Sequence, residues 1–267
     1  MIKPQIIRWS GLHYGWVVLL IAMICQIFTA PGQTVGVSEF KDLYAHQLQA
    51  SPRTVAIYYC YGTALGSFAL PLFGFLIDRI GCRSSLIVIS SLLAITCFLS
   101  GWVTNVWGML LAFTFLRMLA QGALSLVAST MVALWFKRKL AIAYSVMSVG
   151  SGFGMMFVPY VFKPLFQTFE LAVGFQIIAL GICLLIPLAI FLVVDRPSLI
   201  GLSQDGDPIP RENQEPSANE KSHWINPDDF TFWEAISTRS FWIVTASQSA
   251  WALIGTGLVF NRKSIFT

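Results

Sequence analysis

Seven long stretches with almost no charge run through the 267 residues of this chain. They cover residues 14–37, 54–77, 84–106, 108–136, 140–162, 171–194 and 240–261. Only Arg117 places a charge inside one of them. A helix needs about 20 apolar residues to cross the ~30 Å hydrocarbon core of a bilayer, so each stretch can form a span. The sequence predicts an all-α integral membrane protein with six helices, a polar segment and a seventh helix.

Composition agrees with a membrane protein and gives no sign of an enzyme. Charged residues make up 11% of the chain, against about 25% in soluble domains, and the mean hydropathy is +0.70. The five cysteines include no C-x-x-C pair, and neither a zinc-protease helix motif nor a phosphate-binding glycine loop occurs. We therefore expect no cofactor, no metal site and no catalytic residues. The net charge of +4 is explained by membrane topology, so no nucleic-acid partner is expected.

The basic residues predict the orientation of the chain in the membrane. If the N-terminus is cytoplasmic, eleven of the 17 lysines and arginines fall on the cytoplasmic side and five on the other. Cytoplasmic loops carry an excess of these residues. The sequence thus predicts a multi-pass protein of the cell membrane, surrounded by the lipid bilayer, with its N-terminus inside.

The chain divides into three predicted parts. Residues 1–195 hold the six predicted spans, and residues 239–267 hold the seventh. Between them, residues 196–238 are too polar to fold alone and form a predicted cytoplasmic linker. Near its end, Thr231 and Glu234 match a capping box, which predicts a short helix at the membrane interface.

A cluster of charges and glycines lies between the second and third predicted spans. It consists of Gly74, Asp78, Arg79, Gly81 and Arg83. The pattern resembles the signature loop of the major facilitator superfamily of secondary transporters. The resemblance implies that these residues form a gate, in which Asp78 accepts hydrogen bonds from a loop arginine. It also implies that Asp78 faces the amino end of a helix in the second half of the transporter, where a carboxylate is stabilised.

Arg117 is the strongest candidate for a substrate or coupling residue. A charged side chain in the middle of a span costs ~2.5 kcal/mol or more, so it usually faces a cavity or a partner. Arg117 and Gln121 lie one helical turn apart, on one face. Their spacing resembles the fourth-helix motif of the same superfamily, whose arginine is linked to proton or substrate coupling. Gln33, near the outer end of the first span, lies among small residues and is a further candidate substrate or coupling residue, because a glutamine at a cavity wall can hydrogen-bond a carboxylate.

Small residues in two of the predicted spans favour close packing against neighbouring helices. Gly62 and Gly66 form a G-x-x-x-G pair in the second span, and Gly150 and Gly154 form another in the fifth. Such faces let helices approach closely. Pro159 makes the fifth span a candidate for a kink. These residues can serve ordinary helix packing or take part in gating, and the sequence leaves both interpretations open.

Further patterns narrow the resemblance. They are Tyr14-Gly15-Trp16, the stretch around Gln33, Arg196-Pro197 and Asp205-Gly206. Together they are similar to the monocarboxylate and oxalate–formate branch of the superfamily. That branch implies a transporter of small organic anions working by alternating access, as an antiporter or a symporter, with a proton as the candidate coupling ion.

The superfamily fold has two six-helix halves that bind substrate between them. Against that fold, residues 239–267 are the first helix of an incomplete C-terminal half. We therefore expect a truncated chain that is inactive alone or depends on a partner, namely a separate C-terminal half or a second copy. Two alternatives stay open: a half-transporter that works as a dimer, and a membrane sensor or binding protein that does not transport.

Overall fold

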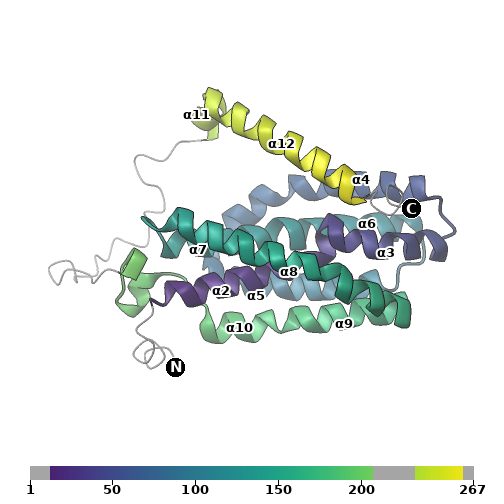
Figure 1. Cartoon of the computed structure of the whole chain (residues 1–267), viewed down its shortest axis with the longest axis horizontal. Helices are drawn as coiled ribbons and strands as arrows, with labels where there is room; N and C mark the ends of the chain where they lie inside the picture. Colours follow the sequence, from purple (N-terminus) through teal and green to yellow (C-terminus); the bar gives the residue numbers. More distant parts are fainter. Residues whose placement is uncertain (1–12, 207–231, 261–267) are drawn as a thin grey trace. The chain divides into compact units, whose positions relative to one another are not determined.

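The computed structural model describes residues 13–206 and 232–260, and within these ranges the ordered secondary structure is helical. The chain divides into two units, Met1–Ile209 and Pro210–Thr267. Each unit is described by itself below, with the elements labelled as in Figure 1. The all-helical membrane fold predicted from the apolar stretches is confirmed.

The helices of the first and second spans are each broken once, and a single turn joins the second span to the third. The first span consists of α2 (Gly15–Ile27), the 3₁₀ turn η1 (Ala30–Gly32) and α3 (Thr34–Gln47). The second consists of α4 (Pro52–Phe68) and the first turns of α5 (Leu70–Ser100), and the rest of α5 is the third. By length and apolar character, Pro52–Ser100 is one 49-residue candidate membrane stretch, but it contains two spans because the backbone turns at Gly81.

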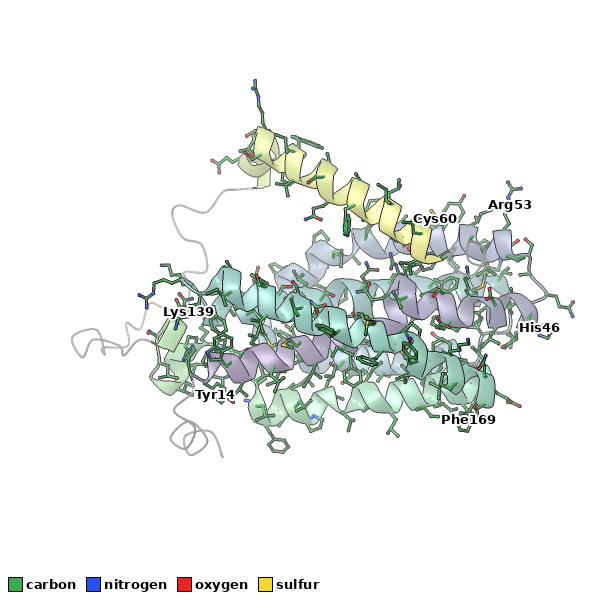
Figure 2. The ribbon with its side chains drawn as sticks, in the orientation of Figure 1. Tyr14, His46, Arg53, Cys60, Lys139 and Phe169 are labelled. Carbon is green, nitrogen blue, oxygen red and sulfur yellow. The ribbon has the colours of Figure 1, made fainter. Side chains whose placement is uncertain are left out.

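The fourth, fifth and sixth spans complete the first unit. The fourth consists of α6 (Val106–Leu116), the π-helical segment η2 (Arg117–Leu124) and α7 (Ser125–Trp135). The fifth is α8 (Leu140–Thr168), and the sixth is α9 (Leu171–Cys183) followed by α10 (Leu185–Leu192). Tyr14 and Lys139 lie at one end of this bundle, and His46, Arg53 and Phe169 at the other (Figure 2). We name these the inner end and the outer end, after the orientation that the basic residues predict.

The first span is longer than predicted. Its apolar stretch ends at Val37, but α3 continues to Gln47. The reason is packing: Phe40 and Tyr44 have no exposed surface, and Tyr44 donates a 2.6 Å hydrogen bond to the carbonyl of Ser100. The ring of Phe40 lies 4.9 Å from that of Phe175 and edge-on to it, a favourable aromatic geometry. These contacts keep the extra turns inside the bundle despite their charged neighbours.

The charged segment between the second and third spans is also more helical than predicted. We expected a loop between the predicted spans, over residues 78–83, but α5 stays helical through Ile80. Gly81 alone leaves the helical region, with φ 84° and ψ 164°. That conformation is open almost only to glycine, so one residue makes the turn.

The glycine pairs lie where two helices meet closely. A Cβ at Gly62 would lie 2.9 Å from the Cβ of Phe113, and one at Gly66 would lie 3.1 Å from the carbonyl oxygen of Thr114. A Cβ at Gly150 or Gly154 would overlap the side chain of Met23 or Ile27 in the first span. Pro159 lies inside α8, which is one helix from Leu140 to Thr168.

The second unit holds two helices in the described residues. They are α11 (Phe232–Ser237) and α12 (Arg239–Phe260), which has 22 residues and coincides with the predicted seventh span. The short helix expected near Glu234 is α11, while Thr231 lies outside the described residues.

We predict that Gly62→Ala lowers the midpoint of thermal unfolding in detergent by several degrees. The added methyl group forces Phe113 away, and overpacking of this kind costs about 1–3 kcal/mol. Gly152→Ala is the matched control, because nothing lies within 4 Å of its Cβ and alanine favours a helix. Equal midpoints for the two variants would show that the α4–α6 contact is not tight.

Candidate functional site

Arg117 lies at the start of η2, in the middle of the fourth span. Its Nε donates a 3.1 Å hydrogen bond to the hydroxyl of Thr63 in α4. Its Nη1 donates a 3.0 Å hydrogen bond to the carbonyl of Gly32, and its guanidinium carbon lies 5.1 Å from the ring centre of Tyr59. The guanidinium therefore ties together the first, second and fourth spans.

Two helix breaks meet at Arg117. The first span breaks at η1, and the fourth changes to π-helical winding at η2. Gly32 allows the two to touch, since a Cβ there would overlap the carbonyl oxygen of Leu116 and lie 2.7 Å from the Cβ of Ala120. Irregular backbone inside a membrane occurs where protein or a cavity satisfies its polar groups. Segments of π-helix are frequent at functional sites.

A cavity of about 230 Å³ opens beside the guanidinium. Its walls come from α4, α5 and η2 and consist of Thr63, Gly66, Ser67, Leu70, Arg117, Gln121 and Gly122. The amide oxygen of Gln121 is buried, and no hydrogen-bond partner for it occurs among the described residues. The Nη2 atom of Arg117 takes part in neither of the two hydrogen bonds above. The cavity is thus lined by a fixed cation, two hydroxyls that already donate to carbonyls of their own helix, and the side chain of Gln121.

Gln33 does not reach this cavity. It is the residue before α3, and its Nε2 donates a 3.2 Å hydrogen bond to the hydroxyl of Thr29. Of the three predicted substrate or coupling residues, the structure brings Arg117 and Gln121 together and leaves the side chain of Gln33 bound within its own span.

The fourth span carries further polar residues that were not among the predicted site residues. Ser125 and Ser129 follow Arg117 and Gln121 at four-residue intervals, and all four are half-buried on one side of the helix. The hydroxyl of Ser125 donates a 3.1 Å hydrogen bond to the amide oxygen of Gln26 in the first span. The four-residue spacing is a signal that could have found them. Thr63 carried no such signal, because its role depends on the approach of another helix.

At the inner end, the turn at Gly81 is held by a carboxylate that we did not predict. The Oδ1 atom of Asp195, just after α10, accepts a 2.7 Å hydrogen bond from the backbone N–H of Arg83. A Cβ at Gly81 would lie 2.9 Å from the same oxygen. Asp195 therefore caps the first turn of the third span, where backbone N–H groups lack helical partners.

Asp78 does not have the contacts expected for it within the described part of the chain. It is exposed, and no hydrogen bond or ion pair joins it there to Arg79 or Arg83. The guanidinium of Arg79 lies 6.0 Å from the ring centre of Phe75. Gly74 lies within α5, with only Leu126 in contact range of a Cβ. Gly74, Asp78 and Arg79 thus lie in the helical part of α5, just before the turn that Gly81 and Arg83 form with Asp195.

The end of the sixth span is fixed by side chains from three other spans. The last carbonyls of a helix have no partner within it. Here Arg83 donates to the carbonyl of Ile190 at 2.7 Å, Tyr14 to that of Leu192 at 2.6 Å, and Trp135 to that of Val194 at 3.0 Å. The inner ends of the first, third, fourth and sixth spans are therefore joined.

The first unit thus combines six spans with helix breaks, a membrane-embedded arginine beside a cavity and a glycine turn at the inner end. Charged residues inside spans and broken helices are features of membrane transporters. A family model described as the Major Facilitator Superfamily matches residues 15–263, and the chain belongs to that family. No curated protein matches the chain. The family predicted from the sequence is confirmed, and its members are transporters rather than enzymes.

We predict that Gly81→Ala destabilises the inner end more than Gly201→Ala. Both glycines have positive φ, 84° and 72°, but only Gly81 also lies against a neighbour, Asp195. Gly201 is in the left-handed region that alanine tolerates better, and nothing lies within 4 Å of its Cβ. Gly81→Ala therefore adds a clash to backbone strain of about 1–3 kcal/mol. Limited proteolysis near residue 81 measures the difference, and equal cleavage of the two variants would contradict it.

Proposed function

We propose that this protein is a secondary transporter of small organic anions, with Arg117 as the cation that binds the substrate carboxylate in the first unit. The observation that carries the proposal is the cavity beside Arg117, where the guanidinium is held by Thr63 and Gly32. Arginine binds carboxylates through two parallel N–H donors, and the Nη2 atom is not used by those two bonds.

The size and polarity of the cavity favour a small anion. A volume of about 230 Å³ lies below the roughly 300–1,000 Å³ of pockets for drug-sized ligands, which favours an acid of a few carbons. Within its lining the only charge is that of Arg117. A buried unpaired charge is costly, so a bound carboxylate would be stabilised there. Gln121 also lines the cavity, and the N–H₂ group of its amide is a donor that can supply a second contact to a carboxylate.

We propose the substrates, the transport mechanism and the membrane orientation from the sequence. Monocarboxylates, oxalate and formate are the proposed substrates, because the motifs resemble that branch of the family. We propose an antiport or proton-linked symport mechanism, in the cell membrane, with the N-terminus in the cytoplasm. Alternating access needs a second six-helix unit facing the first. We propose that a second six-helix unit facing the first completes the transport cycle.

We predict that Arg117→Gln weakens carboxylate binding and, because it removes the hydrogen bonds to Thr63 and Gly32, also lowers the unfolding midpoint measured without an anion. Binding to the folded state raises the unfolding midpoint, so oxalate, formate, lactate and acetate are each titrated against purified protein in a thermal-shift assay. Loss of hydrogen bonds to a charged group weakens affinity by roughly tenfold or more. Arg117→Lys keeps the charge but loses the paired donors, and we expect intermediate affinity.

Arg53→Gln is the matched control, since Arg53 is an exposed arginine in the first turn of α4 at the outer end. It should bind the anions as the unaltered protein does. If none of the four anions raises the midpoint, or if Arg117→Gln responds to them like the unaltered protein, the proposal is wrong.

A further inference from the structure

The segment that follows the sixth span lies across the inner end of the first unit. We define it as the strap, residues 193–206. It contains two short 3₁₀ turns, η3 (Pro197–Ile200) and η4 (Gln204–Gly206). An aspartate lies near each end, Asp195 and Asp205.

Asp205 caps the start of the fifth span. Its Oδ2 atom accepts hydrogen bonds from the backbone N–H groups of Arg138 at 2.7 Å and Lys137 at 3.2 Å. Its Oδ1 atom accepts one from the N–H of Lys139 at 3.1 Å. These residues form the turn that leads into α8 at Leu140. A carboxylate there satisfies N–H groups that have no helical partner and faces the positive end of the helix dipole.

The same end of the strap also binds the end of the fourth span. The amide of Gln204 donates a 3.2 Å hydrogen bond to the carbonyl of Leu134, in the last turn of α7. Two adjacent strap residues, Gln204 and Asp205, thus form hydrogen bonds with backbone groups on both sides of the turn between the fourth and fifth spans. This turn is tied to the strap rather than free at the surface.

Asp205 is in an uncommon backbone conformation. Its φ is 62° and its ψ is 0°, and it is only 6% exposed. A residue other than glycine keeps positive φ where the surrounding contacts determine it, and such strain is found at functional positions. The three hydrogen bonds to the carboxylate are the contacts that hold it.

The carboxylate of Asp205 stays ionised at neutral pH. Burial by itself would raise its pKa. The hydrogen bonds from Arg138, Lys139 and Lys137, together with the charge of Arg138, hold the pKa below its ordinary value. The folded-state pKa is lowered, so the stability that this cap contributes is present above the ordinary pKa of about 3.9 and is lost only as the pH falls below it.

The other end of the strap caps the third span. Asp195 accepts the hydrogen bond from the N–H of Arg83 and lies against Gly81, as described above. The strap therefore places one carboxylate at the start of the third span and another at the start of the fifth. Between them, Gly201 makes the left-handed turn that ends η3.

We propose that Asp195 and Asp205 are positioning residues that couple the 81–83 turn to the 137–139 turn through the strap. The inner starts of the third and fifth spans then move as one body. This coupling is a property of the first unit, and only its effect on transport rests on the proposed function. Neither aspartate lines the cavity beside Arg117.

Hydrogen exchange of the backbone amides in the full chain, reconstituted in nanodiscs, tests the coupling. Asp205→Asn should speed exchange at residues 137–139 by roughly tenfold or more, because hydrogen bonds to a charged acceptor are lost. The deciding readout is the distant turn: exchange at Arg83 should rise as well. Coupling is reciprocal, so Asp195→Asn should speed exchange at residues 137–139.

Glu170→Gln is the matched control. Glu170 precedes α9 as the residue at its N-terminus, but its side chain makes no capping hydrogen bond. This variant should leave both turns unchanged. If Asp205→Asn does not fold, Gln204→Ala removes one hydrogen bond from the same end and should give a smaller rise at both turns. Faster exchange confined to residues 137–139 would show two independent caps and overturn the proposal.

Transport gives a second readout that a merely stabilising role would not move. In cells, Asp205→Asn should lower the maximal rate of labelled oxalate or lactate uptake several-fold with unchanged KM. Its anion-induced thermal shift should equal that of the unaltered protein. An unchanged rate per folded molecule would overturn the role in transport. No thermal shift in the unaltered protein would instead refute the proposed function and leave the exchange result standing.

Discussion

The hydrogen bond from Arg117 to the carbonyl of Gly32 joins the two irregular points of the membrane bundle. A lipid bilayer offers no water to backbone groups, so a broken helix needs protein partners at its break. The first span breaks at η1 and the fourth winds as a π-helix at η2, and each lies against the other. A charge that would be costly in an intact apolar helix is thereby solvated by backbone and hydroxyl oxygens. The cavity lies beside the second of these breaks, between η2 and the helices α4 and α5.

The same requirement organises the inner end. Helix ends leave backbone N–H and C=O groups without partners, and here side chains from other spans satisfy them. Asp195 and Asp205 accept from the starts of the third and fifth spans, while Arg83, Tyr14 and Trp135 donate to the end of the sixth. Because each contact joins elements far apart in the chain, the first unit behaves at this end as a single connected body.

Sequence patterns predicted what depends on local composition. Apolar stretches located the spans, and the cost of a buried charge singled out Arg117. The sequence patterns did not predict features of the structure that depend on contacts between helices. The α3 helix passes Val37 because Phe40 and Tyr44 are packed by other helices. Asp195 was not selected, and Asp205 was noted only as part of a motif, since nothing local shows which helix start either residue reaches. The superfamily was recognisable from short motifs, whereas the anion-transporting branch stays a prediction.

We propose above that Arg117 contacts the substrate carboxylate. Solid-state NMR can measure this directly, through the dipolar coupling between ¹⁵N-labelled arginine and ¹³C-carboxyl-labelled oxalate bound to the protein in bilayers. Spectra of Arg117→Lys assign the signal, because this variant removes one arginine and keeps a charge. We expect a coupling at contact distance in the unaltered protein that disappears in the variant. A bound oxalate whose carboxyl carbons show no coupling to Arg117 would contradict it.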